Sequence, residues 1–137
     1  MYTPSDDTFL LADCIRQYYG VRALEIGVGS GLLLNILEKN FAYVAGSDID
    51  LQALQNCKQQ KTTSANVLLV CCDAGSAFGI GKFDLIVSNP PYLPKDDNNT
   101  RDPAVNGGPT GIEITVHFIN SALPLLAGEG KMLIVVS

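Results

Sequence analysis

The feature that most constrains the fold is a glycine-rich turn that joins a short apolar segment to a helical one. Residues 23–26 suit a buried strand, Gly27-Val28-Gly29-Ser30-Gly31 follows them directly, and residues 32–39 continue with helical spacing. A strand, a glycine turn and a helix in this order begin the unit from which parallel sheets are built. The glycines allow a tight turn and let a ligand approach the backbone closely.

The same alternation continues along the chain. Apolar runs at 43–47, 67–72, 83–88 and 131–136 predict further strands, and helical spacing predicts helices at 9–18, 51–60 and 112–126. This order indicates an α/β fold with a doubly wound, Rossmann-like and mostly parallel sheet. We expect residues 1–137 to form a single domain. Gly20 is expected to cap the end of the first helix, and Asp50 to cap the start of the helix at 51–60.

Acidic residues stand where strands of this predicted sheet end. Asp48 follows the second strand and Asp73 the third, and the carboxyl ends of parallel strands meet along one edge, where such sheets bind ligands. Asp48 is placed to bind ribose hydroxyls, with a helix cap as the alternative. The turn has the spacing GxGxG, and Glu25 precedes it. Both features disfavour a phosphate and favour a cationic or amino-bearing ligand.

Asn89-Pro90-Pro91-Tyr92 follows the fourth strand at this edge. The two prolines fix an extended backbone and remove two N–H donors, so acceptors dominate the local surface. Asn89 adds a side-chain carbonyl, and Tyr92 offers a flat apolar face. This set suits a planar group that carries an –NH₂, with the acceptors holding its hydrogens. A rigid loop without a ligand is the alternative. The polar residues 93–111 that follow are interpreted as a substrate-facing lid or as plain disorder.

Composition excludes some classes of function. The net charge of −5 disfavours nucleic acid as the main partner. The four cysteines lack CxxC spacing, so we interpret them as buried free thiols and expect no metal site. His117 is expected to be structural or solvated, with no partner identified. No apolar run reaches the length of a membrane helix and no signal peptide is visible, so a cytoplasmic or nuclear location is expected.

The combined motifs carry a resemblance to a known family. The set consists of Glu25-x-Gly27-x-Gly29-x-Gly31, Asp48, Asp73 and Asn89-Pro90-Pro91-Tyr92. Together these motifs resemble those of the class I S-adenosylmethionine-dependent methyltransferases that modify nitrogen. The opening Tyr2-x-Pro4-x-Asp6-Asp7-Thr8-Phe9-Leu10-Leu11 resembles the HemK-like glutamine methyltransferases of peptide release factors, in particular their short eukaryotic and archaeal branch. The resemblance implies methyl transfer from S-adenosylmethionine to the glutamine of a Gly-Gly-Gln motif in a class I release factor.

The resemblance also implies a role for each motif residue. Thr8 would close over the methionine end of the cofactor, and the turn around Glu25 would border it. Asp48 would hold the ribose and Asp73 the adenine amino group. The cofactor residues implied are Thr8, Glu25, Gly27, Gly29, Gly31, Asp48, Asp73 and Asn89. The catalytic residues implied are Asn89, Pro90, Pro91 and Tyr92, with Asn89 and the Pro90 carbonyl gripping the substrate –NH₂.

The family pattern leaves further expectations about the extent of the sheet and about a partner, and some alternative functions stay open. The chain stops after the fifth predicted strand, so the sheet is expected to lack the last strands of the full fold. The strand from Val67 to Cys72 is expected at the opposite edge, where a small zinc-binding activator subunit would dock unless the chain's own helices cover it. Alternative functions are amino-methyl transfer to adenine or guanine in nucleic acid, transfer to protein lysine, and a non-catalytic cofactor-binding subunit.

Overall fold

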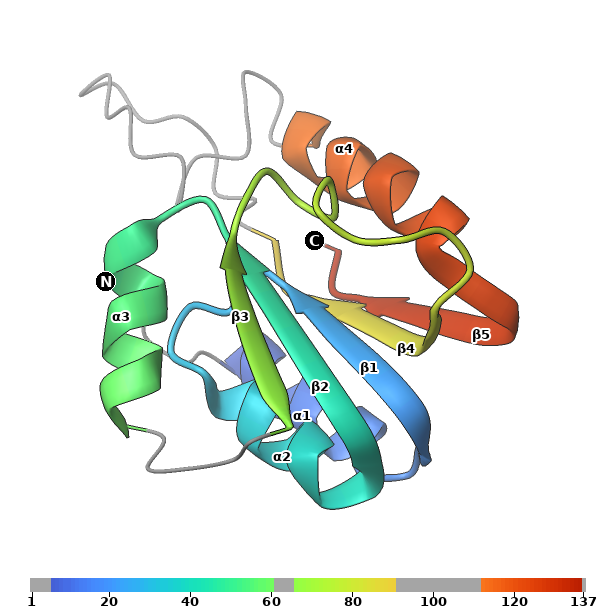
Figure 1. The fold of residues 1–137 in the computed structure, drawn as a ribbon, viewed down its shortest axis with the longest axis horizontal. Coiled ribbons are helices and arrows are strands. Elements are labelled where there is room, and N and C mark those ends of the chain that lie inside the picture. The colour runs from blue at the N-terminus through green and yellow to red at the C-terminus, as the bar shows by residue number, and fades with distance from the viewer. Residues whose placement is uncertain (1–5, 61–65, 91–111, 137) are drawn as a thin grey trace.

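The computed structural model describes residues 6–60, 66–90 and 112–136, which form a five-stranded parallel sheet with helices on both faces (Figure 1). The strands are β1 Gly20–Ile26, β2 Phe41–Asp48, β3 Val67–Cys71, β4 Phe83–Ser88 and β5 Leu126–Ile134, in the spatial order β3-β2-β1-β4-β5. All four neighbouring pairs are parallel, which confirms the α/β, doubly wound prediction. No helix among the described residues is both long and apolar enough to span a membrane.

Two apolar clusters sandwich the sheet. On one face lie α1 Asp6–Ile15, α2 Leu32–Asn40 and α3 Leu51–Gln60, which pack on the sheet through one large core. On the other face lie α4 Glu113–Ala122 and the 3-10 turn η1 Leu123–Leu125 (Figure 1). The helices bury residues three or four positions apart, as amphipathic helices do. The second half of β1 is buried on both faces because helices cover both.

The direction in which the sheet grows changes between β1 and β4. β2 and β3 extend it on one side of β1, while β4 and β5 extend it on the other. At such a switch point the connections leave in opposite directions and open a crevice beyond the carboxyl ends of the strands. The glycine turn leaves β1 at this point, and Asn89 leaves β4 beside it.

Several predicted boundaries need correction. Gly20 is not a helix cap: α1 ends at Ile15, and Gly20 is the first residue of β1, paired with Phe41. A Cβ at Gly20 would lie 2.8 Å from the Phe41 ring, so close packing explains this glycine. At the other end of the sheet, β5 begins at Leu126, earlier than predicted, and bulges against β4. Its glycines weakened the strand pattern in the sequence.

The cysteine prediction is right for one residue and wrong for two. Cys57 is buried on α3, where burial and the Glu25 carboxylate raise the pKa of its thiol. Cys14 and Cys71 are exposed, because Cys14 lies on the outer face of α1 and Cys71 ends an edge strand. All four are free thiols.

Candidate functional site

The strand register aligns the predicted site residues along one edge of the sheet. Ile26 of β1 is opposite both Ser47 of β2 and Ser88 of β4. The next residue on each of these three strands therefore stands at the same level. Along the edge from β4 to β3, the polar groups come in the order Asn89, Glu25 with its glycine turn, Asp48 and Asp73.

The glycine turn is tied to the neighbouring strand by its backbone. The carbonyl oxygen of Ser47 accepts hydrogen bonds from the N–H groups of Gly27 at 2.8 Å and Val28 at 3.1 Å. Gly27 and Gly31 have φ of +79° and +84°, a region that side chains disfavour. At Gly31 a Cβ would also lie 2.8 Å from the Cys57 sulfur. The turn can therefore bring its amides close to a ligand while remaining packed from below.

Asp48 is held by backbone donors at the end of β2. Its Oδ2 accepts from the Gly29 N–H at 3.2 Å, and its Oδ1 accepts from the Asp50 N–H at 2.9 Å. Burial raises the pKa of the Asp48 carboxyl, and these two hydrogen bonds partly oppose that increase. Asp50 accepts from the Gln52 N–H at 2.9 Å, which confirms it as the cap of α3. Asp48 is thus left to face the crevice.

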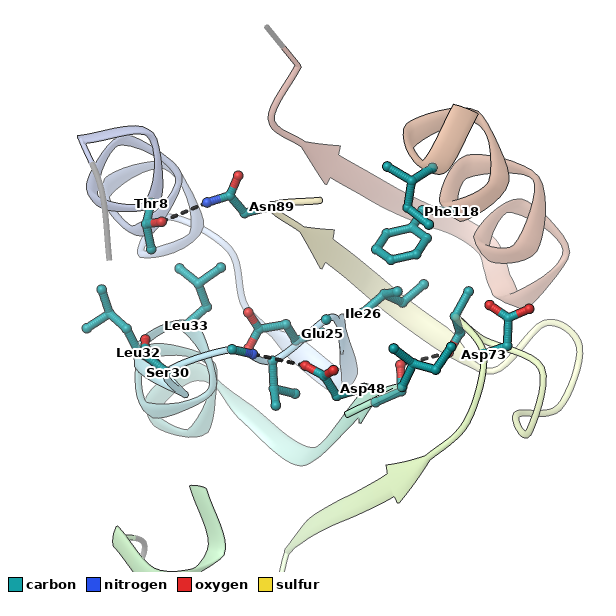
Figure 2. Close-up of a pocket in the computed structure, with 17 residues that line it drawn as sticks. Thr8, Glu25, Ile26, Ser30, Leu32, Leu33, Asp48, Asp73, Asn89 and Phe118 are labelled. Carbon is teal, nitrogen blue, oxygen red and sulfur yellow. Dashed lines mark hydrogen bonds between the residues drawn. The ribbon is translucent and has the colours of Figure 1, made fainter. Parts of the chain in front are cut away.

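Thr8 and Asn89 meet at the β4 end of the row. Asn89 Nδ2 donates to Thr8 Oγ1 at 2.7 Å, although the two residues are far apart in sequence. Thr8 is buried on the inner face of α1, so the amide is held against a fixed point. With its nitrogen directed at Thr8, the Asn89 amide has its oxygen turned away from Thr8 (Figure 2).

Asp73 stands at the other end of the row and has a partner from α4. Asp73 Oδ1 and His117 Nε2 are 2.8 Å apart. The sequence named no partner for His117, and the structure supplies Asp73 as one, while the His117 side chain remains 47% exposed. Periodicity placed His117 on a helix but could not show which strand end that helix would cross.

These groups line a single hollow of about 800 Å³, counted with the space at its open mouth. Asn89 and Thr8 lie toward one end of the hollow, Asp73 and Phe118 toward the other, and Glu25 and Asp48 between them (Figure 2). Polar groups therefore lie at several separate points along an elongated cavity.

Most of the predicted site residues come together here. Those that line the hollow are Thr8, Glu25, Gly27, Gly29, Asp48, Asp73 and Asn89. Gly31 does not line it and is instead the N-cap residue of α2. Pro90 is buried directly after Asn89. Pro91, Tyr92 and the predicted lid at 93–111 lie outside the described residues.

The sequence analysis missed an apolar wall on the hollow. Ile114 and Phe118 of α4 line it, together with Ile49, which follows Asp48. Phe118 is buried, and its ring is 3.6 Å from where a Gly27 Cβ would lie. The spacing of Ile114 and Phe118, four residues apart on a helix after Asn89, was the available signal. Such a wall suits the faces of a planar ring.

Comparison with known proteins assigns the family. The model of the methyltransferase small domain matches residues 5–137. The chain belongs to this family. A protein of Methanocaldococcus jannaschii, named as a candidate protein N5-glutamine methyltransferase, is 34% identical over 87% of this chain and 63% of its own length. The release factor glutamine methyltransferase of Caulobacter vibrioides is 30% identical over 80% of this chain and 44% of its own length. The chain thus spans less than two thirds of these relatives.

A solved structure agrees with this fold. The Mtq2-Trm112 complex of E. cuniculi, described as responsible for methylation of the eRF1 termination factor, includes a similar chain. The two chains superpose with a TM-score of 0.72 and 27% identity, over 88% of this chain and 67% of the other. The fold of this domain is therefore the Rossmann-like methyltransferase fold.

The hollow fits the methyl donor of this family, S-adenosylmethionine. Asp48, ionised, can accept from a ribose diol, and Asp73 can accept from the adenine amino group. The Glu25 carboxylate, 2% exposed at the root of the glycine turn, favours a cationic ligand nearby. The apolar wall suits the purine faces, and the order of these groups follows the length of the cofactor.

The raised pKa of Asp48 makes ligand affinity depend on pH. A ribose diol is held best by the carboxylate, so affinity should fall as acidification protonates Asp48. Because the pKa is raised, the fall should begin above the ordinary Asp value of about 3.9. Calorimetric titration with S-adenosylhomocysteine between pH 4 and 8 measures it.

The matched control is Asp48→Asn. It should bind about tenfold to hundredfold more weakly at neutral pH, the scale of a hydrogen bond to a charged group. Its affinity should lose the acid-dependent step. A wild-type affinity that stays flat over the same range would contradict this role of Asp48.

Proposed function

We propose that this chain is the catalytic domain of an S-adenosylmethionine-dependent N-methyltransferase that acts on the side-chain amide of a protein glutamine. The best candidate substrate is the glutamine of the Gly-Gly-Gln motif in a class I release factor. The observation that carries the proposal is the order of polar groups along one sheet edge, from the fixed Asn89 amide to Asp73. The names of the relatives support the substrate.

The contact between Thr8 and Asn89 lies at the end of the hollow where the methyl-accepting substrate would bind, which is here called the acceptor end. A side-chain amide can present either its oxygen or its nitrogen, and only the oxygen can accept from a substrate –NH₂. In the structure Thr8 accepts from Asn89 Nδ2 at 2.7 Å, and this orientation turns Oδ1 away from Thr8. Thr8 therefore helps to prepare Asn89 for the substrate, beyond the cofactor contact that the sequence implied.

The reaction requires little from the protein beyond positioning of the substrate nitrogen and stabilisation of the charge that develops on it. S-adenosylmethionine, when bound, supplies an electrophilic methyl group. The substrate amide nitrogen is a poor nucleophile because its lone pair is delocalised. Asn89 Oδ1 and the Pro90 carbonyl would hold its hydrogens, aim it at the methyl group and stabilise the positive charge that develops on it. A dedicated base is not required, because the product proton can leave after transfer.

The direct test is transfer of labelled methyl from S-adenosylmethionine to a class I release factor. Label should appear on the intact protein and vanish when the glutamine of its Gly-Gly-Gln motif is changed to alanine. The same assay is carried out in parallel on protein lysine substrates, single-stranded DNA and RNA. Label only on one of these would replace the glutamine assignment, and no label on any of them would contradict transferase activity.

Thr8 offers a sharper prediction about the acceptor end. Thr8→Val keeps the shape but removes the acceptor oxygen, so the Asn89 amide can rotate. We expect kcat to fall at least tenfold, since one misplaced donor or acceptor costs this much in a preorganised site. The Kd of S-adenosylhomocysteine should change less than threefold, which is small on this scale.

Thr8→Ser is the matched control, since it keeps a hydroxyl group at the same place. It should retain most of the activity. If Thr8→Val instead weakens the ligand and leaves kcat unchanged, Thr8 serves the methionine end of the cofactor and not Asn89.

We also propose that a small activator subunit docks on the β3 edge of the sheet. β3 is an edge strand of the described sheet, and the hollowed sheet face beside it is lined by buried core residues together with some exposed side chains. Leu68 of β3 is 59% exposed, and Tyr43 of β2 is 54% exposed. An edge with unpaired backbone groups and apolar neighbours is suited to a partner that adds a strand. The partner in the similar E. cuniculi complex, Trm112, supports a subunit of this kind.

Leu68→Lys should therefore weaken co-purification with a Trm112-type subunit. Leu68 is a better site than Leu69, because Leu69 packs against the core beneath α3 while Leu68 points outward. Leu123→Lys, at a residue 53% exposed on η1, is the matched control. Equal recovery of the subunit with both variants would place the interface elsewhere.

A further inference from the structure

The contact between His117 and Asp73 lies beside the hollow, and the proposed function gives His117 no role. His117 lies on α4 one residue before Phe118, which lines the hollow. It is the only histidine of the chain. Its Nε2 reaches Asp73 Oδ1 at 2.8 Å, across 44 residues of sequence. The helix that supplies the apolar wall thus also contacts the carboxylate at the far end of the row.

The turn that carries Asp73 has an unfavourable backbone conformation and is held by hydrogen bonds from two other elements. Ala74, the next residue, has φ of +49°, which is unfavourable for a residue with a side chain. Its carbonyl accepts from the buried Ser47 hydroxyl at 2.7 Å, which ties the turn to β2. The Gly75 N–H donates to Ser121 Oγ of α4 at 2.9 Å. These bonds hold the backbone of the turn, whereas His117 holds the carboxylate itself.

The contact limits where the hydrogen can lie when Asp73 is ionised. An ionised carboxylate only accepts, so Nε2 of His117 must carry the hydrogen. A neutral His117 is then the Nε2–H tautomer. Its bond engages Oδ1 of Asp73 and restricts rotation of the carboxylate, which leaves Oδ2 for another donor. Asp73 lines the hollow, so that donor can come from a ligand.

We propose that His117 is a positioning residue, which orients Asp73 to accept from the 6-amino group of a purine and so selects an S-adenosyl over an S-inosyl ligand. The inference rests on the proposed function, since it takes the hollow to be the S-adenosyl site. In the S-inosyl ligand an oxygen replaces the amino group. Held in place, the carboxylate repels that oxygen. Free to rotate, it can turn away from it.

A purely structural role for the pair is a weak alternative. The side chains of His117 and Asp73 are 47% and 59% exposed. Exposed ion pairs add little to stability because water screens them. Loss of the His117 side chain should therefore leave the urea midpoint of unfolding nearly unchanged. A change in ligand selectivity would be the property that a stability role does not explain.

The test compares two substitutions against two ligands by calorimetry. His117→Leu removes the donor, while His117→Gln keeps an N–H that can reach Asp73. The ligands are S-adenosylhomocysteine and S-inosylhomocysteine. For His117→Leu, affinity for the adenosyl ligand should fall about fivefold, the scale of one net hydrogen bond. Affinity for the inosyl ligand should not fall. The ratio of adenosyl to inosyl affinity should therefore decrease. His117→Gln should recover most of the wild-type ratio.

Nuclear magnetic resonance supplies a second readout, because the single histidine gives an unambiguous signal. A long-range ¹H–¹⁵N spectrum of the ligand-free protein reports the environment of His117 Nε2, and its ¹⁵N shift should change in Asp73→Ala, which removes the hydrogen-bond acceptor. An Nε2 shift that is the same in Asp73→Ala and in the wild type would overturn the pair.

The outcomes separate the two proposals. If the wild type binds S-adenosylhomocysteine and His117→Leu keeps the wild-type selectivity ratio, the role of His117 is overturned and the proposed function stands. If the wild type does not bind S-adenosylhomocysteine, the proposed function fails, and this inference fails with it.

Discussion

The carbonyl oxygen of Ser47 is the point on which the site depends, since it accepts the first two amides of the glycine turn. Through it the end of β1 is fixed to the end of β2 at the same level. The Ser88 hydroxyl then donates to the Ile26 carbonyl at 2.8 Å, which fixes β4 to the same level. A shift of one strand by one residue would turn its side chains to the opposite face. The alignment of Asn89, Gly27 and Asp48 is thus a consequence of strand register.

The sequence was sufficient to predict what depends on local pattern. The strand at 83–88 and the helix at 51–60 were predicted at their observed bounds, since apolar runs between clear turn signals define such elements. Asp48, Asp73 and Asn89 were placed at one edge because parallel strands all end there. The parallel topology therefore brings these three residues, which are far apart in sequence, to the same edge of the sheet.

What the sequence could not predict depends on how distant elements meet. The contact between Thr8 and Asn89 joins α1 to the end of β4, and no periodicity relates these residues. The wall formed by α4 was missed because a helix pattern shows which residues share a face and not which sheet end that face covers. Gly20 was misassigned for a related reason: the Phe41 ring that excludes a side chain there comes from the next strand. Each miss concerns packing between elements.

The order of polar groups along the sheet edge has a consequence for how such a domain can change. In the proposed function each strand end serves a different part of the bound molecules, so the residues at each strand end could vary independently. Asn89 and Thr8 come from the end of β4 and from α1, whereas the two acids beyond the glycine turn come from the end of β2 and from the turn after β3. Substitutions around Asn89 could therefore admit a new nucleophile without disturbing the hold on the donor. The fold separates the choice of what is modified from the source of the group that modifies it.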